Sequence, residues 1–235
     1  MVRVWLPDRP GALGAVASRI GAVRGDLIGI DILEQGGGRA IDELVVALPD
    51  DELVSLLISE MSQVDGVDVE DVRPVSDEIH DARLDALETA AVLVEQTTPE
   101  ALLDALIDHA CRDFESDWAA VVGSEAPVPV RTVGDVPPAA WLRAFVAGSR
   151  AMLDGIAPVR VGSGHAEDER GGHGPDDVAW AELDEAGLAL VLGRERRPWR
   201  ARERRQLSAL ARIADRRWLE LVTRVARLVH PSATG

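Results

Sequence analysis

The chain has 235 residues, of which 46% are hydrophobic and 28% charged, as is usual for a globular protein with one large or two small domains. Its net charge of −16 argues against nucleic-acid binding through most of the surface. The sequence has no run of about 18 apolar residues that would predict a membrane span, no signal-peptide pattern at its start and a single cysteine, which excludes a disulfide framework, so the expected compartment is the cytoplasm.

The first 33 residues predict a strand, a helix and a second strand. Residues 2–6 alternate between apolar and polar side chains, and the two prolines and the glycine of residues 7–11 end that pattern. Residues 12–23 carry apolar side chains at helical spacing. Residues 27–33 are rich in isoleucine, which is typical of a strand.

The next forty residues predict a hairpin, a second helix and a last strand. The glycines at 36–38 favour a tight turn into a strand at 40–48. Pro49-Asp50-Asp51 opens a helix, because carboxylates favour its positive N-terminal end, and residues 67–72 form a strand. The order β-α-β-β-α-β predicts a ferredoxin-like domain over residues 1–75.

The loop after the first strand resembles a known signature. Its sequence Asp8-Arg9-Pro10-Gly11-Ala12-Leu13 resembles the D-x-P-G-x-L motif of ACT domains, and Gly25-Asp26-Leu27-Ile28 resembles the turn of that family into its second strand. The resemblance implies a regulatory domain that binds a small effector, usually an amino acid, at the interface of a homodimer. The ligand-binding residues that it implies are Asp8, Arg9, Pro10, Gly11, Ala12, Leu13, Leu27 and Ile28.

The residues of this loop suit an amino acid in physical terms as well. A helix N-terminus offers unpaired N–H groups to an α-carboxylate. Gly11 would let a ligand approach the backbone, and Asp8 could pair with an α-ammonium group. The alternative is that Asp8 only caps the helix, Pro10 starts it and Gly11 packs tightly against a strand.

Leu27 departs from the pattern of family members that bind serine-like effectors, which often carry asparagine at this position. An apolar side chain cannot form a hydrogen bond with a polar effector. Leu27 therefore favours either an apolar amino acid such as valine, leucine or isoleucine, or no ligand.

Residues 76–235 predict a second α+β domain with a long terminal helix. The first predicted helix carries the apolar stripe Leu84, Leu87, Ala91 and Val94, and the second is capped by Thr98 and runs to Phe114. Strands at 117–122 and 128–133, a helix after Pro138 and a glycine-rich loop at 162–176 follow. The last elements are a hairpin of strands 177–183 and 188–192 and a helix from Pro198 to His230. This order, with a closing strand before a long helix, resembles GAF domains. The resemblance implies a sensor fold with an apolar pocket over its sheet.

The terminal helix carries a heptad pattern and many arginines. Its apolar positions are Leu207, Ala211, Ala214, Trp218, Leu221, Val225 and Leu228. They could pack on the sheet of their own domain or, with the helix of residues 84–94, form a bundle across a dimer. Residues 194–235 have a net charge of +8, and their arginines could form a solvated face, contact an acidic patch of a partner or bind nucleic acid.

The sequence contains no recognisable catalytic set. It lacks a phosphate-binding glycine pattern and a G-x-S-x-G elbow. His165 and His173 lie beside acidic residues in a glycine-rich loop, which would not fix a metal site. His109 is expected to be a packed or surface histidine, and Cys111 a small buried side chain. No metal or cofactor is expected.

Three interpretations follow from these observations. The first is a non-catalytic sensor that binds an amino acid in its ACT-like domain and forms a homodimer. The second is an interaction scaffold, or the detached regulatory subunit of an enzyme, without a small ligand. The third is an enzyme that uses the second domain.

Overall fold

The computed structural model describes residues 1–75, 82–123, 128–155, 177–195 and 197–229. In these residues the protein is a mixed α/β molecule with two separate four-stranded sheets, both antiparallel. The chain divides into two compact units. Unit 1 comprises residues 1–81 with 200–203, and unit 2 comprises residues 82–199 with 204–235. The boundary expected from the sequence, after residue 75, lies a few residues before this division.

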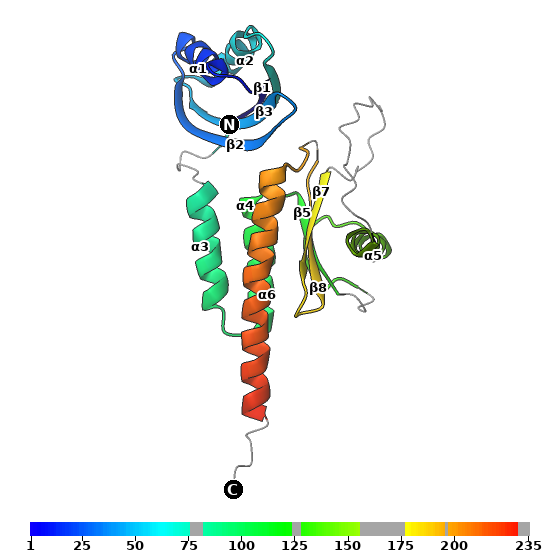
Figure 1. Cartoon of the computed structure of the whole chain (residues 1–235). Coiled ribbons are helices and arrows are strands. Elements are labelled where there is room, and N and C mark those ends of the chain that lie inside the picture. The colour runs from blue at the N-terminus through cyan, green and yellow to red at the C-terminus, as the bar shows by residue number, and fades with distance from the viewer. Residues whose placement is uncertain (76–81, 124–127, 156–176, 196, 230–235) are drawn as a thin grey trace. The chain divides into compact units, whose positions relative to one another are not determined.

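Unit 1 has the element order β-α-β-β-α-β (Figure 1). Its elements are β1 (Val2–Pro7), α1 (Ala12–Ala22), β2 (Asp26–Gly36), β3 (Arg39–Ala47), the 3-10 turn η1 (Asp51–Leu53), α2 (Val54–Ser62) and β4 (Asp68–Val72). Asp50 caps η1 by accepting a hydrogen bond from the N–H of Glu52 at 2.9 Å. Strand β2 is longer than the predicted strand at 27–33, because it pairs with β3 from Asp26 to Gly36.

The sheet of unit 1 has the strand order β2-β3-β1-β4, so that β2 and β4 are its edges. Helices α1 and α2 cover one face (Figure 1). The core between them is apolar and includes Val4, Val16, Ile20, Leu44, Leu57 and Met61, all almost inaccessible to solvent. Alternation along β1 places Val2, Val4 and Leu6 toward the helices, and therefore Arg3 and Trp5 on the other face.

Trp5 is held on this second face by polar contacts. Its indole Nε1–H donates to the Glu70 carboxylate at 3.1 Å. The Arg39 guanidinium lies over the ring, 5.2 Å from its centroid, as in cation–π pairs. Nearby, Arg3 donates to Glu43 at 2.8 Å. This side of the unit 1 sheet thus carries ion pairs and one aromatic ring beside the buried Ile41.

Unit 2 consists of one sheet and four helices among the described residues. Its elements are α3 (Ala82–Glu95), α4 (Pro99–Asp113), β5 (Trp118–Gly123), β6 (Arg131–Gly134), α5 (Ala139–Gly155), β7 (Val178–Leu183), β8 (Leu188–Gly193) and α6 (Ala201–Val229). Strand β6 begins at Arg131 and not at Val128 as predicted, since its pairing with β5 in the ladder starts there. Helix α6 begins at Ala201, three residues after Pro198.

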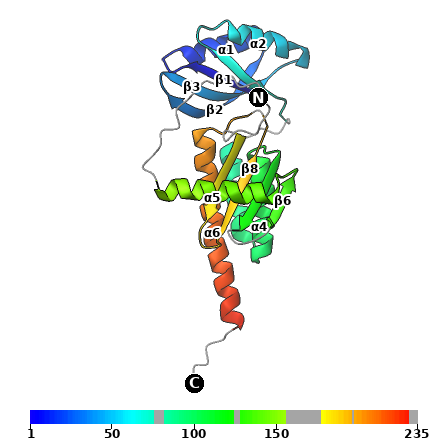
Figure 2. The same cartoon turned by 90° about the vertical axis from the view of Figure 1, so that its right-hand side faces the viewer.

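The sheet of unit 2 lies between two helical layers (Figures 1 and 2). Its strand order is β6-β5-β8-β7. Helices α4 and α6 cover one face with a large apolar cluster. On the other face, Leu142 and Val146 of α5 pack on Trp118 and Val191. β5 and β8 are buried along their whole length, which explains why both are apolar on both faces.

Close packing at the end of β8 depends on a glycine. A Cβ atom at Gly193 would lie 2.1 Å from Cε2 of Trp118. The Trp118 ring is buried and meets the edge of Trp141 at a centroid distance of 6.4 Å. Position 193 therefore has no room for a side chain.

A buried arginine follows β8. Arg194 is 2% exposed and donates to the carbonyl oxygens of Phe114, Arg197 and Pro198 at 2.8 to 3.1 Å. Its guanidinium lies 4.2 Å from the Trp199 ring centroid. These contacts fix the loop between β8 and α6, and they supply the hydrogen bonds that a buried guanidinium requires.

The two predicted apolar stripes of unit 2 differ in their burial. On α6, the seam residues Leu207, Ala211, Ala214 and Leu221 are buried in the core of their own unit, while Val225 is 50% exposed. On α3, the stripe does not form the contact with α4. Thr89 and Leu93, both 0% exposed, lie on the buried side, whereas Leu87 and Val94 are 69% and 53% exposed.

Candidate functional site

The loop from β1 to α1 is held to the β2–β3 turn by its backbone. The N–H of Asp8 donates to the Gly38 carbonyl at 2.9 Å. The N–H of Arg9 bonds to Pro7 at 2.8 Å, and that of Ala12 bonds to Arg9 at 3.2 Å. The loop has a defined path, with Asp8, Arg9, Pro10 and Gly11 exposed.

The N-terminus of α1 has no side-chain cap. Its N-cap residue is Gly11, and no acidic side chain lies in the first turn. The capping role considered for Asp8 is therefore wrong, because the chain turns at Gly11 and the helix starts at Ala12. Uncapped N–H groups and the positive end of the helix dipole can receive a carboxylate.

Gly11 is required by its backbone conformation and not by packing. Its φ is +87°, in the left-handed region that favours glycine. A Cβ atom here would meet no atom within 4 Å. The interpretation that Gly11 packs tightly against a strand is thus wrong, and the space beside it is open.

Asp42 on β3 is a residue of this region that the sequence analysis missed. It lies opposite Val4 of β1 and Ile32 of β2, in the same row as the core residues Ala40 and Leu44. It is 3% exposed, and its Oδ1 is buried with no hydrogen-bond partner among the described residues. Burial raises the pKa of the Asp42 carboxyl, and the negative charge of Asp8 raises it further.

A signal for Asp42 was nevertheless present in the sequence. In a strand, residues 40, 42 and 44 share one face. Ala40 and Leu44 mark that face as apolar, so an acidic residue between them stands out. A buried carboxylate oxygen without a hydrogen-bond partner is unfavourable, which makes Asp42 an unusual residue on this apolar face of unit 1.

Strand β2 exposes a row of isoleucines. Ile28, Ile30 and Ile32 are 52%, 42% and 46% exposed. The register places Ile30 opposite Leu44 and Ile32 opposite Asp42, and therefore on the helix-covered side of the sheet. The row lies on an edge strand of 11 residues. Its apolar side chains therefore lie beside backbone groups that no neighbouring strand pairs with on the outer side of β2.

The other predicted site residues belong to the core of unit 1. Ala12 is 3% exposed, and Leu13 and Leu27 are partly buried against the same cluster. They position the loop and β2 but present little surface to a ligand. Of the eight predicted residues, those exposed are Asp8, Arg9, Pro10, Gly11 and Ile28.

Polar clusters in unit 2 hold helices together. The buried Thr89 hydroxyl donates to Asp113 at 2.5 Å and lies 3.2 Å from Nδ1 of His109, which fixes α3 on α4. Cys111 is half-buried and donates to the Ser116 carbonyl at 3.0 Å. Burial, with the charges of Asp108 and Asp117, raises the pKa of its thiol, so it is a poor nucleophile at neutral pH.

Over the described ranges, no group of three or more metal-ligating side chains is placed to hold an ion. His165 and His173, with the acidic residues beside them, lie outside the described residues. None of the helices in these ranges is long and apolar enough to cross a membrane. No protein-family model matches the sequence, and no curated protein matches it.

Proposed function

We propose that the protein is a non-catalytic regulatory protein that binds an amino-acid effector in unit 1 at a homodimer interface. The observation that carries this proposal is Asp42, a buried carboxylate whose Oδ1 lacks a partner and whose pKa is raised by burial and by Asp8. A cation beside Asp8 and Asp42 would favour the charged form of the Asp42 carboxyl and so oppose both effects. An α-ammonium group is such a cation.

The remaining parts of an amino acid also have complementary groups. The uncapped N-terminus of α1 after Gly11 would receive the α-carboxylate. Ile30 and Ile32 offer apolar surface beside Asp42. A side chain such as that of valine, leucine or isoleucine would cover part of this surface, in agreement with the apolar Leu27 at the start of β2.

The edges of the sheet support association through β2. Strand β4 is short and carries Asp68, Glu70 and Asp71 in five residues, and such charges prevent edge pairing. Strand β2 is twice as long and exposes isoleucines. Pairing of β2 with β2 of a second copy would bury the isoleucine row close to the effector site, at the interface between two units that the resemblance to ACT domains implies. Unit 2 would then act as the GAF-like part that transmits or receives a second signal.

Thermal unfolding with each of the twenty amino acids tests the proposal. A ligand at about 100 times its Kd stabilises the protein by roughly 2.7 kcal/mol, and each kcal/mol shifts Tm by about 4–8 °C for a domain of this size. We expect a shift with an apolar amino acid. Asp42→Asn should abolish that shift, while Asp65→Asn, an exposed acidic residue of the same unit, should preserve it. An unchanged shift in the Asp42→Asn protein would contradict the proposal.

The second candidate is an interaction scaffold without a small ligand. The exposed isoleucines of β2 favour it as well, because they need only a protein partner. Under this alternative, no amino acid changes Tm. Ile30→Lys would reduce self-association of the protein without any effect of ligands.

A further inference from the structure

Among the described residues, no cation forms an ion pair with the buried carboxyl group of Asp42. Its Oδ1 has no hydrogen-bond partner in those ranges, and the residue is 3% exposed. Glu70 has a buried oxygen of the same kind, but that oxygen lies 4.0 Å from Nε of Arg3, and the other accepts a hydrogen bond from the Trp5 indole. Asp42 differs from Glu70, because the neighbouring charge that acts on it, Asp8, is also negative.

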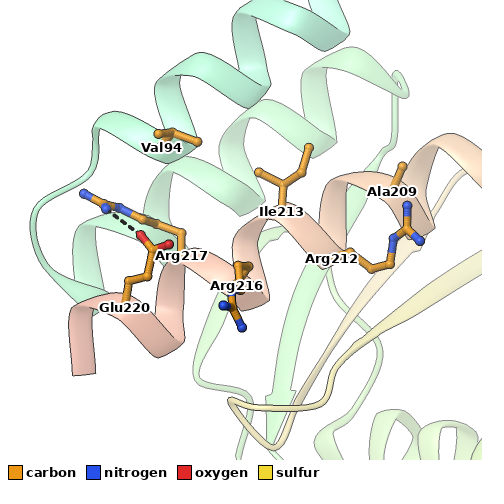
Figure 3. Close-up of a pocket in the computed structure, with 7 residues that line it drawn as sticks. All are labelled: Val94, Ala209, Arg212, Ile213, Arg216, Arg217 and Glu220. Carbon is orange, nitrogen blue, oxygen red and sulfur yellow. Dashed lines mark hydrogen bonds and ion pairs between the residues drawn. The ribbon is translucent and has the colours of Figure 1, made fainter. Parts of the chain in front are cut away.

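The hollow between α3 and α6 in unit 2 offers no comparable group. It measures ≈ 360 Å³, and Figure 3 shows Val94 of α3 and Ile213 of α6 in its wall, with arginines along α6. One of these, Arg217, donates to Glu220 at 3.0 Å and to the Gln96 carbonyl at 2.8 Å. None of the residues that line this hollow carries a buried polar atom without a partner. A ligand there would satisfy no such atom, whereas a ligand beside Asp42 would.

The elements packed around Asp42 present apolar side chains to it. Val4 of β1 and Ile32 of β2 lie directly opposite it in the sheet, and the first turn of α1 contains no acidic residue. Burial and the charge of Asp8 both raise the pKa of the Asp42 carboxyl, and the exposed Arg9 beside Asp8 does not offset them. The free protein therefore keeps the proton on this carboxyl to a higher pH than an exposed aspartate would.

We propose that binding of an amino-acid effector releases the proton of the Asp42 carboxyl, so that pH regulates the effector site. This inference rests on the function proposed above for unit 1. The ammonium group of the effector keeps its own hydrogens and donates to the carboxylate that forms, while the proton of Asp42 passes to the solvent. An uncharged group in place of the ammonium would give the carboxyl no reason to ionise.

The release of a proton makes the affinity for the effector depend on pH. Affinity rises with pH while the free protein holds the proton, by up to about tenfold per pH unit for one proton. It becomes constant once Asp42 is ionised in the free protein. By the same linkage, the bound effector lowers the pKa of the Asp42 carboxyl. At a given concentration of amino acid, the protein therefore carries less effector at low pH than at neutral pH.

Calorimetry of the full chain with L-valine, L-leucine and L-isoleucine measures the released proton. The heat of binding is recorded in buffers with different ionisation enthalpies, and its dependence on the buffer gives the number of protons. Over a series from about pH 4 to about pH 8, we expect release of up to one proton in the acid half and none at the alkaline end. The Kd should decrease over the range in which the proton is released. The control is 2-hydroxy-4-methylpentanoate, which has the carbon skeleton of leucine without an ammonium group and should release no proton.

Two variants and a spectroscopic titration assign the proton to Asp42. Asp8→Asn removes the neighbouring negative charge, so the pH at which the Kd becomes constant should fall. Asp65→Asn, at an exposed acidic residue of the same unit, should leave this pH unchanged. In carbon-13 NMR, the carboxyl carbon of Asp42 is identified by its loss in Asp42→Asn. In the original protein it should titrate at a higher pH than that of Asp65, and at a lower pH once the amino acid is added.

The outcomes separate this inference from the function on which it rests. If none of the three amino acids binds at any pH of the series, the proposed function fails and the proton release fails with it. If an amino acid binds without releasing a proton and with a Kd that is independent of pH, only the proton release is overturned. A carboxyl of Asp42 that titrates like that of Asp65 in the free protein would overturn it in the same way.

Discussion

The absence of a side chain at Gly193 allows Trp118 to pack between the sheet of unit 2 and α5. A Cβ atom there would lie within 2.4 Å of three atoms of the Trp118 indole, and this ring is 4% exposed between α5 and the sheet. Apolar close packing of this type cannot tolerate an added methyl group without a shift of the backbone.

We therefore expect Gly193→Ala to lower the free energy of unfolding by about 1–3 kcal/mol. Urea unfolding of the full chain measures this change. Gly148→Ala on α5 is the matched control, since a Cβ atom there meets nothing within 4 Å and alanine is the better helix former by up to about 1 kcal/mol. Equal stabilities of the two variants would show that Trp118 can move away.

Residue-scale chemistry was only partly predictable from the sequence. The motif located the exposed loop Asp8–Gly11, but a motif says nothing of which neighbouring strand residues face it. Asp42 lies 34 positions further along the chain and comes beside Asp8 only through the pairing of β1 with β3. Leu27 was assigned to the site because of its position in the family pattern, and its side chain is partly buried against the core of unit 1.

At the scale of elements, the cap of α4 is a local feature that the sequence predicted correctly. Thr98 has extended backbone angles, and its hydroxyl accepts a hydrogen bond from the N–H of Ala101 at 3.2 Å. Pro99 follows as the first helical residue. Threonine before proline therefore suffices to fix the start of this helix.

Thr98→Ala should lower the free energy of unfolding by about 1 kcal/mol, because one N–H of the first turn loses its acceptor. Thr97→Ala removes the same atoms one position earlier, where no cap is formed, and should have a smaller effect. Thr98→Ser, which keeps the hydroxyl, should restore most of the loss. Chemical denaturation of the three variants gives the comparison, and equal losses at 97 and 98 would refute the capping role.

Which face of a helix or strand is buried was harder to predict than the helix or strand itself. Helical spacing identified α3, but spacing alone does not state which side meets α4. Thr89 takes the inner side because its hydroxyl is bonded to Asp113 and His109. The length of β2 was underestimated for a similar reason, since Asp26 and Glu34 join the strand through pairing with β3 and not through their own strand preference.

At the scale of the whole molecule, Asp42 links stability to pH. Its pKa is raised in the folded protein, so the folded state holds this proton to a higher pH than the unfolded chain does. The stability that the neutral carboxyl provides is complete below the unfolded-state pKa, near 3.9, and it is lost as pH rises through the folded-state pKa.

Asparagine cannot ionise, so Asp42→Asn removes the loss of stability that accompanies rising pH. The variant should differ little from the original protein in free energy of unfolding below pH 4, and should become increasingly more stable as pH approaches 7. Urea titrations at a series of pH values in the absence of effector measure the difference. Asp65→Asn is the control for the dependence of the free energy of unfolding on pH. A difference in this free energy between the Asp42→Asn and original proteins that stays constant with pH would contradict the prediction.

The excess of arginine after residue 193 is evident from the sequence, but the sequence does not show what these arginines contact. Of the arginines after residue 193, Arg197 pairs with Glu115 and Arg217 with Glu220 inside unit 2, which accounts for part of the basic excess as a solvated, internally paired face. Arg212 and Arg216 are exposed, in agreement with a solvated face.

The aromatic composition gives the protein a convenient optical property. The sequence has six tryptophans and no tyrosine, and Trp5 is the one tryptophan among residues 1–81. Its indole lies between Glu70 and the Arg39 guanidinium, only three residues before Asp8. With the other five tryptophans replaced by phenylalanine, the fluorescence of Trp5 would report on the surroundings of β1, so that events in unit 1 could be followed in the intact chain without an attached dye.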